Sequence, residues 1–266
     1  MVGPGPNPLQ VVGIVYAVLF VVIAALLWRT GRFSRTVRYL LLIVTVLFGF
    51  LFFSPMLPHQ FQELVLRVDS RIGFGLLGGL IGIGVMLVLT FLFGRHFCGY
   101  LCPIGALQEL AYAAPVPKVR TTRKRELSVA RGVVFLVLLG AGLGAGFSLL
   151  SLFGLREFFT LTLSTGSFVF AAVLIISLFL YRPFCRVICP LGVLFQLATA
   201  PGWWKLRRTD ACINCHTCER ACPTGEAHST DLQGECYLCR RCIEACPVAG
   251  ALIYGPQAPV TQAGGE

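Results

Sequence analysis

The chain has 266 residues, of which 56% are hydrophobic and only 13% charged, and its formal net charge is +10. Soluble domains carry about 25% charged residues, so this composition indicates a membrane protein. Residues 1–202 hold 16 basic and 5 acidic residues, whereas residues 203–266 hold 6 and 7. The positive charge therefore belongs to the apolar region, where it sets membrane orientation, and nucleic acid is a poor explanation for it.

Five apolar runs are candidate membrane spans. They occupy Leu9–Trp28, Tyr39–Phe53, Phe74–Phe93, Gly132–Phe153 and Gly166–Tyr181. A span needs about 20 mostly apolar residues. The second and fifth runs reach that length only with their flanks, and a buried or re-entrant helix is the alternative for these two. Glycines spaced four apart in the third and fourth runs predict close helix packing there.

Charge alternates between the loops that join these runs. The first, third and fifth runs are followed by strongly basic segments: Arg29, Arg32, Arg35 and Arg38; then Arg95, Lys118, Arg120, Arg123, Lys124 and Arg125; then Arg182, Arg186, Lys205, Arg207 and Arg208. The second loop mixes Glu63, Arg67, Asp69 and Arg71. Because basic loops face the cytoplasm, we predict five spans in the cytoplasmic membrane, with the N-terminus outside and the C-terminus inside.

The first run has no basic residue ahead of it, so we interpret it as a retained anchor rather than a cleavable signal peptide. On this orientation all twelve cysteines lie in the cytoplasm or at the cytoplasmic membrane face. That compartment is reducing, which favours metal ligation over structural disulfides.

Eight of the cysteines follow one spacing twice. The copies are Cys212-x2-Cys215-x2-Cys218-x3-Cys222-Pro223 and Cys236-x2-Cys239-x2-Cys242-x3-Cys246-Pro247. This spacing is that of bacterial ferredoxins with two [4Fe–4S] clusters. A paired zinc module is the alternative, and the two complete copies with their trailing prolines argue against it. We interpret His216 and His228 as surface residues rather than ligands.

The other four cysteines also occur in a repeat. The segment from Arg95 to Leu110 matches the segment from Arg182 to Leu197 at an offset of 87 residues, and each contains a CxxxCP motif: Cys98 with Cys102, and Cys185 with Cys189. Cysteines four apart lie on one face of a helix. A pseudo-twofold axis along the membrane normal could then bring four thiols together. They could hold an iron–sulfur cluster, a lone metal or a redox-active dithiol, or be packed inert thiols.

The expected fold is an α-helical integral membrane protein with about five transmembrane helices, in which two-helix units form a pseudo-twofold parallel repeat. A small C-terminal α+β ferredoxin-like domain with two [4Fe–4S] clusters follows. The predicted divisions are an N-terminal anchor and basic loop at 1–37, repeat one at 38–128, repeat two at 129–204 and the ferredoxin domain at 205–266.

From Tyr39 onward the order of spans, CxxxCP motifs and double ferredoxin motif resembles the NapH/MauN family of membrane polyferredoxins, whose relatives include NosR and CcoG. The first span departs from the four-span NapH pattern. The resemblance implies one cluster on Cys212, Cys215, Cys218 and Cys246 and a second on Cys222, Cys236, Cys239 and Cys242. It also implies electron exchange with the quinone pool and a redox partner, within a complex in the membrane.

The leading hypothesis is a membrane-bound electron-transfer subunit that links the quinone pool, or a membrane redox partner, to cytoplasmic clusters. A copper reductase or assembly factor is the second hypothesis, and a thiol-based redox sensor is the third. His96 and Glu109 are candidates for proton exchange with a quinone, because the second motif has Pro183 and Gln196 there. The alternative is that they are solvated side chains. No nucleotide loop or hydrolase triad is present, so a self-contained enzyme is not indicated.

Overall fold

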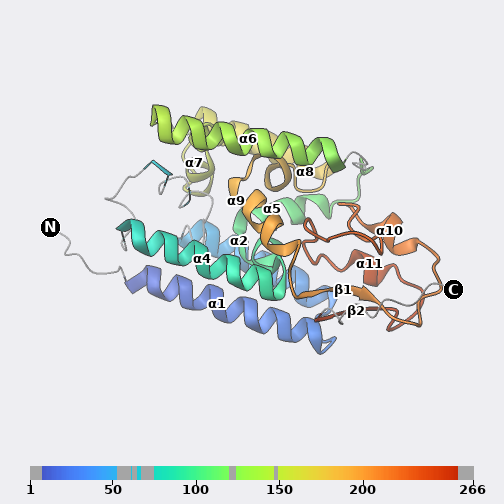
Figure 1. Cartoon of the computed structure of the whole chain (residues 1–266). Helices are drawn as coiled ribbons and strands as arrows, with labels where there is room; N and C mark the ends of the chain where they lie inside the picture. The colour runs from blue at the N-terminus through green and yellow to red at the C-terminus, as the bar shows by residue number, and fades with distance from the viewer. Residues whose placement is uncertain are drawn as a thin grey trace.

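The computed structural model describes residues 8–52, 61, 65–66, 75–119, 124–146 and 149–256. Within these residues five long helices run alongside one another (Figure 1). They are α1 (Pro8–Arg29), α2 (Arg35–Phe52), α4 (Gly75–Phe93), α6 (Lys124–Ala145) and α8 (Thr165–Phe179). The mixed loop with Glu63, Arg67, Asp69 and Arg71, together with Arg120 and Arg123, lies outside the described residues. The helical class predicted from composition is confirmed.

The outer faces of these helices are apolar. On α6, for example, Val133, Leu136 and Val137 are each more than half exposed. Among the described residues, Glu126–Gly144 of this helix is long and apolar enough to cross a membrane. Shorter apolar helices cover Val15–Arg29, Leu80–Phe93, Thr165–Phe179 and Pro190–Thr199. Five complete spans therefore remain a prediction.

Each CxxxCP motif folds into a π-helical turn followed by a ten-residue helix. The first pair is η1 (Phe97–Leu101) with α5 (Pro103–Tyr112), and the second is η3 (Phe184–Ile188) with α9 (Pro190–Thr199). Helix α5 packs against α2 of its own repeat and α8 of the other. Helix α9 packs in the same way against α6 and α4. The two repeats thus exchange equivalent contacts, as a pseudo-twofold arrangement requires.

The ferredoxin module occupies one end of the bundle (Figure 1). It contains strands β1 (Trp204–Arg208) and β2 (Leu252–Pro256), paired antiparallel, and the short helices α10 (Thr217–Ala221) and α11 (Arg241–Glu244). The 3₁₀ turn η2 (Leu149–Phe153) and helix α7 (Leu155–Phe159) connect α6 to α8. Helix α1 packs against α4, η1 and β2, so it contacts both the helices and the ferredoxin module.

The close packing expected from glycine spacing is found at Gly142, where an added Cβ would lie 2.6 Å from the Val65 side chain, but not at the other glycines that the structure tests. A Cβ at Gly82, Gly140 or Gly144 would meet no described atom within 4 Å. The main neighbours of α4 are α1, α9 and β1, whereas those of α6 are η3, α9 and η2. The CxxxCP segments thus supply much of the packing of both helices, through α9 for α4 and through η3 and α9 for α6.

Glu235 provides a test of how the module is attached. Its buried carboxylate pairs with Arg131 at 2.5 Å and with Arg186 at 3.0 Å, joining the module to α6 and η3. We expect Glu235→Ala to lower the free energy of unfolding by about 3–5 kcal/mol, because it leaves the buried guanidiniums of Arg131 and Arg186 without their carboxylate partner. Lys124→Ala is the matched control, since it removes a partly exposed pair with Asp231 and should cost about 1 kcal/mol or less. Equal thermal midpoints of the two variants in detergent would contradict this prediction.

Candidate cluster-binding sites

The twelve cysteines fall into three sets of four, and each set lines one cavity. The first ferredoxin cavity is lined by Cys212, Cys215, Cys218 and Cys246. The second ferredoxin cavity is lined by Cys222, Cys236, Cys239 and Cys242. The CxxxCP cavity is lined by Cys98, Cys102, Cys185 and Cys189. The structure thus brings together the four thiols that lie in two motifs 87 residues apart, and every cysteine is a free thiol.

The spacing of these thiols is relevant to what they could hold. In the described part of the chain, no three His, Cys, Asp or Glu side chains are close enough to bind a single metal ion. This applies equally to the ferredoxin cysteines. A four-iron cluster holds its thiolates further apart than one ion does, because iron and sulfide lie between them. Each set also supplies four cysteines, which is the number that a cysteine-ligated [4Fe–4S] cluster takes.

The second cysteine of each CxxxCP motif caps a helix. Cys102 is the N-cap of α5 and Cys189 that of α9, with proline at the first helical position in both. Burial raises the pKa of Cys102, and the backbone N–H groups of Gly105 and Ile104 oppose that rise by bonding the sulfur. Both sulfurs thus lie at a helix N-terminus, where the helix dipole favours negative charge.

The expectation that Cys98 and Cys102 share one helix face was wrong. Cys98 lies in the π-helical turn, and Cys102 ends that turn in an extended conformation before a new helix begins. The cause is Pro103, which lacks the N–H needed to continue the preceding helix and is favoured at the start of the next. The turn and the helix together aim the two sulfurs into one cavity.

Two glycines permit this sharp reversal. A Cβ at Gly105 would lie 2.6 Å from the carbonyl oxygen of Cys98, and a Cβ at Gly192 would lie 2.6 Å from that of Cys185. Both distances are shorter than an ordinary contact. The motif is therefore better written CxxxCPxG, and the glycine recurs at the same offset of 87 residues.

Gln108 is a site residue that sequence reasoning missed. Its buried amide donates to the Cys185 sulfur at 3.3 Å and accepts from the backbone N–H of Phe184 at 3.1 Å. Arg95 approaches the Cys98 sulfur at 4.0 Å. The position equivalent to Gln108 in the second repeat is Phe195, which is buried. The cavity is therefore pseudo-symmetric in its thiols but not in its hydrogen-bond donors.

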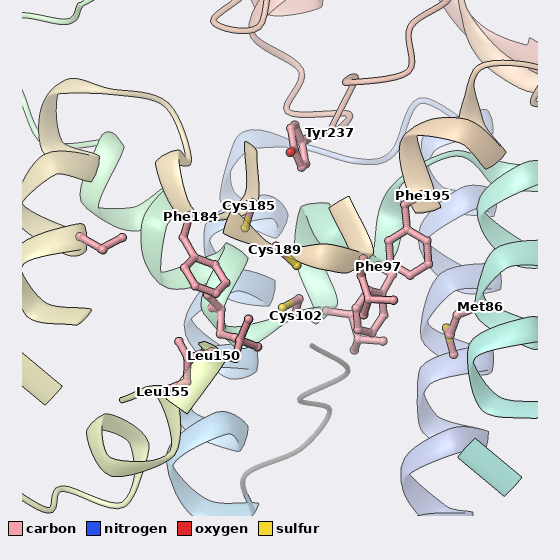
Figure 2. Close-up of a cluster of buried hydrophobic side chains, with 14 of the residues drawn as sticks. Met86, Phe97, Cys102, Leu150, Leu155, Phe184, Cys185, Cys189, Phe195 and Tyr237 are labelled. Carbon is pink, nitrogen blue, oxygen red and sulfur yellow. The ribbon is translucent and has the colours of Figure 1, made fainter. Parts of the chain in front are cut away.

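The second ferredoxin motif is seated directly on this cavity. Tyr237, which follows Cys236, lies with its ring 4.3 Å from the Arg95 guanidinium and 4.9 Å from that of Arg182. These arginines occupy equivalent positions in the two repeats, so the Tyr237 ring contacts both repeats. Figure 2 shows it on the ferredoxin side of Cys185 and Cys189.

Backbone contacts hold the same loop. The Tyr100 hydroxyl donates to the Leu238 carbonyl at 2.5 Å, and Arg38 donates to the Cys239 carbonyl. A Cβ at Gly99 would lie 2.6 Å from the Tyr237 carbonyl oxygen, so the backbone of the first motif touches the loop itself. The Cys236–Cys239 segment is thus fixed to both α2 and η1.

Positive charge is concentrated at this junction. Five arginines there are at most 3% exposed: Arg38, Arg95, Arg131, Arg182 and Arg186. The buried carboxylates among the described residues are those of Glu109 and Glu235. Buried charge is costly unless it is paired. Arg38 pairs with Glu244, Arg131 and Arg186 with Glu235, and Arg182 with Glu109, which leaves Arg95 without a carboxylate partner among the described residues. Four thiolates carry more negative charge than a [4Fe–4S] core carries positive, so a bound cluster would place negative charge near Arg95.

His96 and Glu109 are both buried and held by fixed partners. The His96 ring meets the Tyr254 hydroxyl at 3.1 Å, and burial lowers the pKa of His96 to about 3. Burial of Glu109 opposes ionisation, but the guanidiniums of Arg241 and Arg182 outweigh it and lower the pKa of Glu109 to about 2. A neutral buried histidine and a doubly paired carboxylate are poor proton donors near neutral pH.

Together the fold and the cysteine sets define a ferredoxin-type iron–sulfur protein. A family model described as a 4Fe-4S binding domain matches residues 76–122 and again 163–208, which are the two CxxxCP segments. A second model with that description matches residues 207–225, which include the first ferredoxin motif. The chain belongs to the NapH/MauN-type polyferredoxin family, in agreement with its sequence resemblance.

Its relatives have diverged widely. MJ0750 of Methanocaldococcus jannaschii is 30% identical over 61% of this chain and 73% of its own length. YccM of Escherichia coli K12 is 29% identical over 65% of this chain, and the ferredoxin-type protein NapH of Haemophilus influenzae is 25% identical over 63%. The chain spans 54% of YccM and 65% of NapH. No solved structure matches it.

The close approach at the two glycines gives a direct test. We expect Gly105→Ala and Gly192→Ala each to destabilise the protein by about 1–3 kcal/mol, because the added methyl group overpacks against a carbonyl oxygen. Gly140→Ala is the matched control, since its Cβ would point into open space. Thermal unfolding in detergent measures all three. If Gly105→Ala and Gly140→Ala gave the same midpoint, the close approach would be refuted.

Proposed function

We propose that this protein is a membrane-bound electron-transfer subunit that connects the quinone pool, or a membrane redox partner, to [4Fe–4S] clusters on the cytoplasmic side. The observation that carries the proposal is that the Cys236–Cys239 loop packs directly against the CxxxCP segments. When bound, [4Fe–4S] clusters supply one-electron transfer at potentials set by their surroundings. The chain's own residues fix two cysteine sets next to each other and bury the junction between them.

The ligands proposed for the ferredoxin clusters are the cysteines of the two ferredoxin cavities. Each set takes three cysteines from one motif and the fourth from the other, which is the exchange found in two-cluster ferredoxins. Arg208 approaches the Cys218 sulfur at 3.7 Å and pairs with Glu219, so it bridges β1 to the first set. The exposed side chain of Ile213 beside that set offers an apolar contact for a soluble redox partner.

The proposed membrane placement is supported by where the basic residues lie. Arg29 stacks over Trp204, Lys124 pairs with Asp231, and Arg186 pairs with Glu235. The basic segments that follow the first, third and fifth apolar runs thus all contact the ferredoxin module. Since basic segments remain in the cytoplasm, the module would lie there too, with the apolar outer faces of the helices in lipid.

The two alternative functions have less support. For a copper site, no three His, Cys, Asp or Glu side chains of the described residues are placed to hold one ion. A thiol sensor needs reactive, accessible cysteines with a lowered pKa. Instead Cys102, Cys185 and Cys189 are buried, and burial raises the pKa of Cys185 to about 11 although Arg182 opposes the rise. Electron transfer is the function that this environment favours.

Reduction by quinol tests the proposal. In anaerobic membrane vesicles, we expect added quinol to give the EPR signal of reduced ferredoxin clusters in the wild type. The Cys98/Cys102/Cys185/Cys189→Ser variant should lose this response, because the redox site nearest the membrane is removed. Its ferredoxin clusters should still be reduced by dithionite. A wild type that responds to dithionite but not to quinol, and that binds copper stoichiometrically, would instead support the assembly-factor hypothesis.

A further inference from the structure

We infer that the four CxxxCP thiols jointly hold one [4Fe–4S] cluster, shared between the two repeats on the pseudo-twofold axis. This inference rests on the proposed function, and it identifies the redox centre nearest the membrane as a [4Fe–4S] cluster. The chain would then carry three clusters in total. Each would lie in one of the three cysteine-lined cavities.

Cysteine stoichiometry is the first argument. The 4Fe-4S family model matches each CxxxCP segment separately, which taken alone would suggest one cluster per segment. Each match contains only two cysteines, whereas a [4Fe–4S] cluster held by cysteine takes four. The other eight cysteines of the chain are accounted for by the two ferredoxin cavities. A cluster on these segments must therefore take both pairs.

The cavity supports this arrangement. All four sulfur-bearing residues line it, together with apolar side chains such as Phe97, Phe184 and Phe195. No acidic residue is among those that line it. A cysteine-rich, apolar and acid-free cavity is a suitable environment for an anionic cluster.

Electrostatics is the third argument. The ten-residue helices α5 and α9 both begin at this cavity, and their N-termini favour negative charge. Arg95 lines the cavity, is fully buried, and has no partner for its Nε among the described residues. A buried donor without an acceptor is costly. Cluster sulfides and thiolates would supply acceptors there.

Hydrogen bonding makes one side of the site different from the other. Gln108 donates to Cys185, and its counterpart Phe195 has no donor to offer. Hydrogen bonds to ligating sulfur stabilise the reduced, more negative state of a cluster. We therefore expect Gln108→Leu to lower the reduction potential of this cluster while leaving those of the ferredoxin clusters unchanged.

Iron and acid-labile sulfide per chain, measured on anaerobically purified full-length protein, test the inference. We expect about 12 of each in the wild type, at four per cluster. Cys98/Cys102→Ser and Cys185/Cys189→Ser should each fall to about 8, the same as the quadruple variant, because either pair alone cannot retain the cluster. Cys212/Cys215→Ser is the control, and it should lose the same amount of iron but a different EPR signal.

Two results would overturn the inference. A wild type with about 8 iron atoms would mean that the ferredoxin motifs alone bind clusters, and this count does not depend on any variant folding. A loss of only half the third centre's iron in each two-cysteine variant would mean separate sites. If about 12 iron atoms are found but quinol does not reduce them, the shared cluster stands and the proposed function fails. If only about 8 iron atoms are found and quinol does reduce them, the proposed function stands and the shared cluster fails.

Discussion

Tyr237 lies between the guanidiniums of Arg95 and Arg182, and this cation–π contact fixes where the ferredoxin module meets the helices. The two arginines come from equivalent positions of the repeated motif, so a single aromatic side chain contacts both halves of the bundle. Tyr237 lies in the chain between Cys236 and Cys239, which line the second ferredoxin cavity. The same contact therefore helps to fix that cavity relative to the CxxxCP cavity. Together with the contacts of Gly99, Tyr100 and Arg38, this side chain holds the two cavities in a fixed relation to each other.

The rest of the junction is organised around charge. Buried arginines outnumber buried carboxylates there, and Glu109 and Glu235 each pair with two arginines from different segments. Paired groups of this kind are expensive to break, which makes the module difficult to detach. The surplus of positive charge is also the environment that stabilises anionic clusters. Docking and cofactor retention are therefore two consequences of the same set of side chains.

Sequence reasoning predicted the helical class, the iron–sulfur motifs and the internal repeat, because cysteine spacing and apolar runs are local signals. It did not find Gln108, Tyr237 or the need for Gly105 and Gly192, because those roles depend on contacts between segments far apart in the chain. It also placed Cys98 and Cys102 on one helix, since periodicity does not reveal that Pro103 starts a new one. The buried pairing of Glu109 could not be predicted without its distant partners Arg182 and Arg241.

In the proposed arrangement the two repeats share one cluster beneath the Tyr237 loop. An iron anomalous difference map from crystals of the full-length protein would test it most directly. We predict three peaks of similar strength, one of them between the N-termini of α5 and α9 and on the pseudo-twofold axis. Two peaks, both within the ferredoxin module, would show that the repeats hold no cluster, and four peaks with a separate one at each CxxxCP motif would show that they do not share one.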